Sequence, residues 1–284
     1  MTIAISLKVN DGLVLAADSA STLSEPAGVV NVYNHANKIF NLRKGLPVGA
    51  VTWGAGGIGT SSISTLAKDL RRRFEGEEPD YADWKLDPDN YTISDVKQKV
   101  QDFFFGEQYL SATLDWPKEI EKPSLGFVVA GYSSGEPLAE EYQFTIENGE
   151  LQEQATRGKE EAGVGWNGQP EAITRLIFGA GGMMPQVLEQ DLGVPADQVP
   201  QAMEVIWQRL GIDLVHAAMP FGDAIDLAEF LVDLTVKFSR FIPGAPTVGG
   251  AIEVAAISKH EGFKWIKRKH YFNSELNPPI KEKP

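Results

Sequence analysis

The pattern of apolar and polar positions divides the chain into short strand-like runs and longer helical segments. Residues 2–9 and 13–17 are rich in β-branched and aliphatic side chains, and the Asp-Gly pair between them supplies the positive φ angles of a tight hairpin turn. The chain is therefore expected to begin inside an antiparallel sheet. Further strand-like runs follow at 38–43 and 48–53, 125–130 and 141–146, 161–165, and 251–258 and 263–266.

Helical segments show apolar residues three and four positions apart. This spacing predicts helices with a single apolar face over 61–74, 201–210 and 224–241. Thr92 and Asp95 form a capping-box pattern at the start of another helix, and Pro170 favours the first turn of a further one. Residues 75–90 are acidic and contain two prolines, which predicts an exposed loop.

The order of these elements indicates the fold class. Neighbouring strands are joined by hairpin turns rather than by crossover helices, which favours antiparallel sheets over a parallel doubly wound sheet. Helices with one apolar face cover the outer faces of such sheets. We therefore expect an α+β fold of stacked antiparallel sheets flanked by helices, forming a single domain over 1–272. A C-terminal tail rich in proline and charge is expected over 273–284.

Composition narrows the function classes. The 284-residue chain has a net charge of −13, which disfavours binding to nucleic acid or to an anionic membrane surface. It has no cysteine, so disulfides and thiolate chemistry are excluded. The first residues lack a signal-peptide pattern and no apolar run is long enough to span a membrane, so a cytoplasmic location is expected. The histidines show no metal-ligand spacing, and neither a metal nor another cofactor is expected.

Two glycine-rich motifs suggest other chemistry. The stretch Gly54–Gly59 matches the dinucleotide-binding pattern G-x-G-x-x-G, but an acidic loop follows where a strand ending in an acidic residue is needed. A tight strand-to-helix turn is favoured there, and a nicotinamide-dependent enzyme stays an alternative. The stretch Gly131–Gly135 matches the nucleophile elbow G-x-S-x-G, but a strand-like run follows instead of a helix. Ser133 is therefore interpreted as a hairpin-turn residue.

The second residue, Thr2, is a candidate nucleophile. Threonine is small enough for Met1 to be removed, which leaves a free α-amine beside the threonine hydroxyl. An α-amine has a pKa near 8, so part of the population is neutral at pH 7 and accepts the hydroxyl proton. Nucleophile and general base then belong to one residue. A threonine at this position carries little information on its own.

The surrounding residues resemble the opening of proteasome β subunits. In that family the processed threonine begins a strand, an Asp-Gly-like turn follows, and the second strand ends in Ala-x-Asp, which here is Asp18. A lysine before a hydrophobic pair opens the third strand, and Lys38 with Ile39 and Phe40 fits that place. The chain is thus similar to the proteasome-type N-terminal-nucleophile hydrolases. The resemblance implies a four-layer α-β-β-α sandwich, with insertions near 75–122 and 180–222.

The resemblance also implies roles for single residues. Thr2 is the catalytic nucleophile, Lys38 stabilises its deprotonating oxygen, and Asp18 keeps Lys38 charged and aligned. The backbone N–H of Val51 is the expected oxyanion donor. Two supporting positions depart from the family pattern: Asn167 stands where a serine is usual, and the Asp-x-x-Ser before Gly249 is missing, with Thr247 as a substitute hydroxyl.

These roles imply a threonine endopeptidase or amidohydrolase that acts on peptide or protein substrates within a homo-oligomeric ring. The departures from the family pattern motivate an alternative, a noncatalytic structural subunit of the same fold in a ring assembly.

Overall fold

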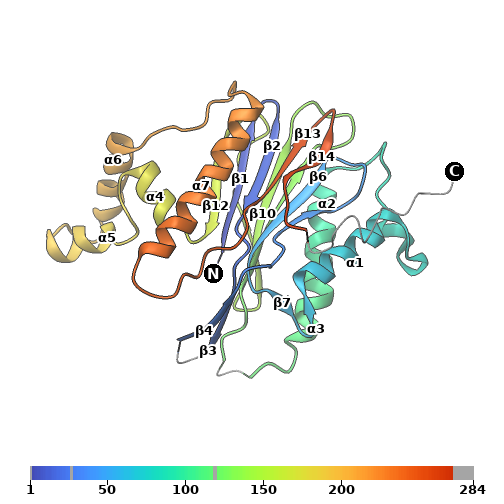
Figure 1. Ribbon diagram of the computed structural model, residues 1–284, viewed down its shortest axis with the longest axis horizontal. Helices are drawn as coiled ribbons and strands as arrows, with labels where there is room; N and C mark the ends of the chain where they lie inside the picture. The colour runs from blue at the N-terminus through green and yellow to red at the C-terminus, as the bar shows by residue number, and fades with distance from the viewer. Residues whose placement is uncertain (1, 26–27, 118–119, 271–284) are drawn as a thin grey trace.

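The computed structural model describes residues 2–25, 28–117 and 120–270, and its strands form two large antiparallel sheets (Figure 1). The first sheet has the order β12 (Gly163–Gly168), β1 (Ile3–Val9), β2 (Gly12–Ala17), β13 (Glu253–Ser258) and β14 (Gly262–Lys267). The second has the order β11 (Glu150–Gln154), β10 (Glu140–Glu147), β9 (Leu125–Gly131), β6 (Val48–Gly54) and β5 (Ile39–Asn41). The predicted hairpins between neighbouring strands are confirmed, including the pair that opens the chain.

Two small ribbons extend from the second and sixth strands. β3 (Ser21–Glu25) and β4 (Gly28–Tyr33) form a two-stranded sheet of their own, which projects beyond the large sheets in Figure 1. β7 (Gly57–Ile58) and β8 (Ser61–Ser62) form a short hairpin before the first helix. The β3–β4 ribbon and β11 were not expected from the sequence.

Helices cover both sides of the paired sheets (Figure 1). On one side lie α1 (Ile63–Glu75), the 3-10 turn Pro79–Trp84, α2 (Ile93–Gln101) with its π-helical continuation Asp102–Tyr109, and α3 (Leu110–Ala112). On the other side lie α4 (Glu171–Phe178), α5 (Met184–Gln186) with the π-helical turn Val187–Asp191, α6 (Val199–Leu210) and α7 (Phe221–Phe241). The expected α+β class with antiparallel sheets and flanking helices is confirmed.

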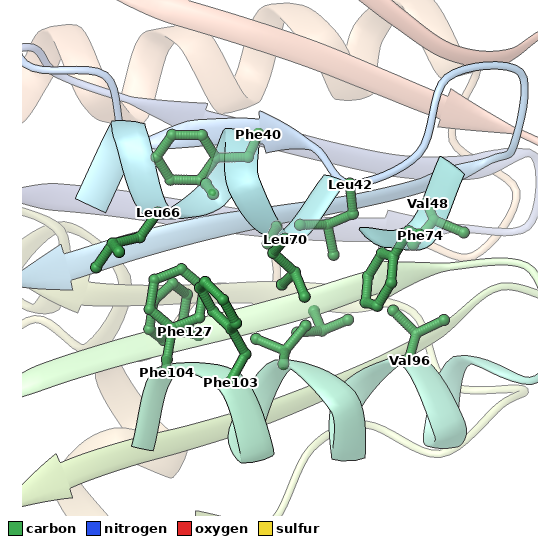
Figure 2. Close-up of a cluster of buried hydrophobic side chains, with 14 of the residues drawn as sticks. Phe40, Leu42, Val48, Leu66, Leu70, Phe74, Val96, Phe103, Phe104 and Phe127 are labelled. Atoms are coloured by element: carbon green, nitrogen blue, oxygen red, sulfur yellow. The ribbon is translucent and has the colours of Figure 1, made fainter. Parts of the chain in front are cut away.

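Three apolar cores explain why the elements pack in this way. Side chains from β1, β2 and β13 meet those from β5, β6 and β9 between the sheets. The opposite face of the second sheet packs on α1 and α2, where Phe127 lies against Phe104 with ring centroids 4.5 Å apart (Figure 2). The opposite face of the first sheet packs on α4 and α7. Strands β1 and β2 are consequently buried on both faces, as their nearly continuous apolar sequence requires.

The segment after α1 differs from the sequence prediction. Residues 75–90 were expected to form an exposed loop. Most of them are exposed, but Pro79–Trp84 form a 3-10 helix in which Tyr81 and Trp84 fold back and stack around Arg73. The guanidinium carbon lies 3.5 Å from the centroid of the Tyr81 ring, and Leu86 is buried. A cation–π cluster around a buried arginine therefore orders a segment that its acidic composition predicted to be open.

Other parts of the chain bear on the predicted domain organisation. The insertion expected near 180–222 contains α5, the π-helical turn after it and α6. Leu188 of the turn forms a small apolar cluster with Val199 and Met203 of α6. The tail expected over 273–284 lies outside the described residues. Among the helices that the structure describes, none is both long enough and apolar enough to cross a membrane.

Candidate functional site

A buried carboxylate, Asp18, occupies the point where β2 leaves the first sheet. Its Oδ1 accepts hydrogen bonds from the Lys38 ammonium at 2.6 Å and from the backbone N–H of Ile3 at 3.0 Å. Its Oδ2 accepts from the backbone N–H groups of Ala20 and Gly249, each at 3.0 Å. A fully buried carboxylate is stable only with such partners. Asp18 therefore joins four segments that lie far apart in the sequence.

Lys38 is buried immediately before β5 and is 5% exposed. Its own carbonyl accepts a hydrogen bond from the N–H of Thr52 at 2.9 Å, which fixes the residue beside β6. Burial lowers the pKa of the Lys38 ammonium below its ordinary value, and the charge of Asp18 opposes that shift. An ammonium carries three donors, so the bond to Asp18 leaves it able to donate to an oxygen in the adjoining cavity.

Thr2 lies directly before β1 and is also buried. Its carbonyl accepts from the N–H of Gln169 at 2.8 Å, which extends the β1–β12 ladder by one position. Gly168 approaches so closely that an added Cβ would lie 2.0 Å from the Thr2 carbonyl oxygen, and its φ is +97°. Glycine is therefore required at 168 for the chain to pass beside Thr2.

Thr2 and Lys38 face one cavity of about 490 Å³. Its walls come from the chain after β2, the chain before β5, the end of β6 and the start of α1, and include Thr22, Tyr33, His35, Trp53 and Gly54. Asp18 connects these two residues, since the same Oδ1 bonds the Lys38 ammonium and the peptide N–H that follows Thr2. The structure thus brings together the three residues that the sequence indicated, Thr2, Asp18 and Lys38.

The Val51 backbone N–H, expected to be an oxyanion donor, does not face this cavity. Successive residues of an antiparallel strand turn their N–H groups to opposite edges. Thr52 donates toward Lys38, whereas Ala55 donates to Ser124 beside β9, so odd-numbered residues here face β9. Val51 is one of them, and its side chain lies between the sheets. Gly54 has the orientation of Thr52 and lines the cavity.

The two supporting positions also lie elsewhere. Asn167 exchanges two hydrogen bonds with Gln143 of β10, at 3.1 and 3.2 Å, and lines a different cavity between the sheets. Thr247 is buried beside a third cavity, where its carbonyl accepts from the Thr22 hydroxyl at 3.5 Å. Among the described residues, neither side chain lines the cavity that contains Thr2 and Lys38.

The two glycine-rich motifs have structural explanations. The stretch Gly54–Gly59 leaves β6, whose neighbours β5 and β9 are both antiparallel to it, so the parallel β-α-β unit of a dinucleotide site is not formed here. Without that unit, the alternative of a nicotinamide-dependent enzyme has no structural basis in this motif. In the second motif Ser133 caps the start of α2, accepting from the Ile93 N–H at 2.9 Å and donating to Glu140 at 2.6 Å. Its interpretation as a turn residue between β9 and β10 is confirmed.

A second buried ion pair beside the site was not foreseen. Lys269 and Glu253 lie 2.7 Å apart, and Glu253 is the β13 residue opposite Ala17, next to Asp18. The sequence offers no signal for this pair, because the two residues lie on different segments, Glu253 at the start of β13 and Lys269 beyond the end of β14. The register of β2 against β13 places Glu253 beside Asp18.

Comparisons with known proteins contradict the family membership that the sequence motifs indicated. No protein-family model matches the chain, and no curated protein matches it. Among solved structures, Anbu (ancestral beta-subunit) from Yersinia bercovieri is 12% identical with a TM-score of 0.48, over 95% of this chain and 88% of that one. A mutant of Anbu from Hyphomicrobium sp. strain MC1 is 16% identical with a TM-score of 0.47, over 95% and 86%.

Likenesses at this level carry no argument about family or activity. The assignment to the proteasome-type family is therefore not upheld, and the ring assembly that it implied stays a prediction. Any functional conclusion has to come from the geometry of the site itself.

Proposed function

We propose that the chain hydrolyses amide bonds with Thr2 as an N-terminal nucleophile, after removal of Met1. One observation supports this most directly: a single oxygen of buried Asp18 bonds both the Lys38 ammonium and the N–H that follows Thr2. Desolvation of a buried ion pair costs free energy. The Asp18–Lys38 pair is nevertheless placed beside Thr2, at a cavity of about 490 Å³, and such an arrangement is typical of a functional site.

In the proposed reaction the Thr2 hydroxyl attacks the carbonyl carbon of the substrate amide. The free α-amine of Thr2 accepts the hydroxyl proton as the Oγ–carbon bond forms, and the Lys38 ammonium stabilises the developing negative charge on Oγ. The protonated α-amine then gives its proton to the departing nitrogen as the carbon–nitrogen bond breaks. Water, deprotonated by the same amine, hydrolyses the resulting ester and regenerates Thr2.

The tetrahedral intermediate needs a donor for its oxyanion. The backbone N–H of Gly54 meets the orientation requirement that Val51 does not, since it points away from β9 and the residue lines the cavity. Strand β5 begins at Ile39, which pairs with Val51, so no residue of β5 lies opposite Gly54. We assign the oxyanion contact to this N–H. In the same proposal, the paired sheets with outer helices correspond to the sandwich fold of N-terminal-nucleophile hydrolases.

Two measurements test the proposal. The intact mass of the purified protein shows whether Met1 has left, because a retained methionine would keep the α-amine of Thr2 in a peptide bond. Labelling by a β-lactone, which acylates activated hydroxyls, then reports the reactivity of Thr2.

We expect labelling to be abolished in Thr2→Ala and strongly reduced in Lys38→Ala. Thr60→Ala is the matched control, because Thr60 is an exposed threonine outside the lining of this cavity, and its labelling should equal that of the unaltered protein. Labelling that persists in Thr2→Ala, or its complete absence from a protein that has lost Met1, would refute the proposal. Complete absence would favour the noncatalytic structural alternative.

A further inference from the structure

The ammonium of Lys269 has all three of its donors matched by nearby acceptors. Nζ lies 2.8 Å from the Ser19 hydroxyl, 2.6 Å from the Ala36 carbonyl and 2.7 Å from Glu253 Oε2. The side chains of Lys269 and Glu253 are 6% and 2% exposed. An ammonium this deeply buried is retained only where its partners satisfy it fully.

The acceptors of Lys269 belong to the segments that carry the candidate site. Ser19 follows Asp18 directly, and Ala36 comes just before Lys38. The N–H of Ala36 also donates to the Ser19 carbonyl at 2.9 Å. Lys269 thus holds together the chain that leaves Asp18 and the chain that arrives at Lys38.

This connection matters because the intervening chain provides little order of its own. Between Ala20 and Asn34 the chain runs out through the β3–β4 ribbon, whose described apolar side chains at Val30 and Tyr33 are more than half exposed. A two-stranded ribbon is only marginally stable by itself. The relative position of Asp18 and Lys38 therefore depends on contacts at the base of the ribbon, where Lys269 lies.

The Lys269–Glu253 pair also acts on Lys38 through its charges. The positive charge of Lys269 lowers the pKa of Lys38, and the negative charge of Glu253 raises it. Asp18 also faces Lys38, and removal of Met1 adds the titratable α-amine of Thr2 at the same cavity. Arg268 on the outer side stacks over the Trp265 ring, and His35 borders the cavity. The two charges of the pair therefore act on Lys38 in opposite directions.

We propose that Lys269 is a positioning residue for the Thr2 site. It holds the segment after Asp18 against the segment before Lys38, and its ion pair with Glu253 compensates its charge beside the site. This inference rests on the proposed function. It adds to the site a glutamate at the start of β13 and a lysine from the segment that follows β14.

Single and double charge removals test the inference through the pH dependence of β-lactone labelling. The alkaline limb of the profile reports loss of charge from Lys38. Glu253→Gln leaves Lys269 uncompensated, so the limb should move to lower pH. Lys269→Met leaves Glu253 uncompensated, so the limb should move to higher pH, each by about one pH unit, as for a charge near a buried group. The double variant should lie between the two.

Positioning itself is tested by the labelling rate at the pH optimum. We expect about a tenfold or larger loss in Lys269→Met and in the double variant, since a small displacement of catalytic groups costs this much. Lys267→Met is the matched control: Lys267 is an exposed lysine two residues earlier, paired with Glu229 at the surface, and neither its rate nor its limb should change. Circular dichroism spectra of each variant test whether it is folded.

The outcomes separate this inference from the proposed function. If the unaltered protein is labelled at Thr2 but the two single variants shift the limb in the same direction, or not at all, Lys269 has no such role and the proposed function stands. If Lys269→Met does not fold, the comparison of Glu253→Gln with the double variant decides the matter. A limb that moves to lower pH in Glu253→Gln and returns toward its original position in the double variant supports the inference, and an unchanged limb in Glu253→Gln overturns it. If Thr2 is not labelled in the unaltered protein, the proposed function itself fails.

Discussion

Replacing Asp18 with asparagine is the sharpest test of how the site is held together. Asp18 is fully buried and its two oxygens accept four hydrogen bonds, one of them from the Lys38 ammonium. Asparagine preserves the shape but turns one acceptor into a donor, which then faces a backbone N–H or an ammonium. It also leaves Lys38 without its counter-charge in a buried position.

The magnitude follows from these contacts. Removing one partner of a buried ion pair costs about 3–5 kcal/mol, because the remaining charge stays desolvated. Lys38 can reduce this cost by losing its proton, since its pKa is already lowered by burial. We therefore expect Asp18→Asn to lower the free energy of unfolding at pH 7 by about 3 kcal/mol or more.

Urea denaturation followed by circular dichroism measures this change. Asp233→Asn is the control, because Asp233 forms an exposed ion pair with Lys237 one helical turn away on α7, and such pairs contribute only about 0.3–0.5 kcal/mol. In the double variant Asp18→Asn/Lys38→Met the buried charge is gone, so part of the loss should be recovered. A loss below about 1 kcal/mol for Asp18→Asn would refute the view that a buried charged network organises this site.

Three further substitutions test the packing and titration of the fold. Burial raises the pKa of Tyr91 to about 12 from 10.0, so its neutral form contributes stability that is present below pH 10 and lost as the pH rises toward 12. In Tyr91→Phe, the free energy of unfolding measured in urea should therefore fall less steeply over this pH range. A fall as steep as in the unaltered protein would exclude Tyr91 as its source. Gly168→Ala should lower the melting temperature and β-lactone labelling together, because its Cβ would meet the Thr2 carbonyl, whereas Gly222→Ala in α7, with nothing within 4 Å, should be neutral or mildly stabilising. Phe127→Ala should cost about 3–5 kcal/mol by opening a cavity between β9 and the π-helical segment Asp102–Tyr109, where Phe104 packs against Phe127, whereas the exposed Phe241→Ala should cost less than about 0.5 kcal/mol. Similar losses at both positions would contradict the packing in Figure 2.

Much of the fold could be predicted from local patterns. The Asn10-Asp11-Gly12 sequence located the first hairpin correctly, but not through the positive φ angles that were expected: none of these residues has one, and Gly12 begins β2, where an added Cβ would lie 2.5 Å from the Ile257 carbonyl oxygen. The 3.6-residue spacing identified α1 and α7 because each has a single buried face. The 3-10 turn after α1 escaped prediction because its order comes from Arg73, Tyr81 and Trp84 stacking together, a tertiary contact that composition does not encode.

The site was predictable only in part for a related reason. Asp18 and Lys38 were identified through the resemblance of their motifs to those of proteasome β subunits, and the structure places their charged atoms 2.6 Å apart. Val51 was misplaced because the direction of a backbone N–H reverses with each residue, so an uncertainty of one position changes the edge that it faces. The role of Asn167 depends on Gln143 in another strand, and the Lys269–Glu253 pair depends on the register of β13, neither of which can be read from one segment.

The central claim is that one residue supplies both nucleophile and base, and an α′,β′-epoxyketone tests it directly. This class of compound reacts with a hydroxyl and a neighbouring free amine to close a ring that includes both atoms. The account predicts that peptide mapping by mass spectrometry finds the adduct on an N-terminal peptide beginning at Thr2, bonded through both Oγ and the α-nitrogen. An N-terminal peptide that retains Met1, or an adduct confined to another residue, would contradict it.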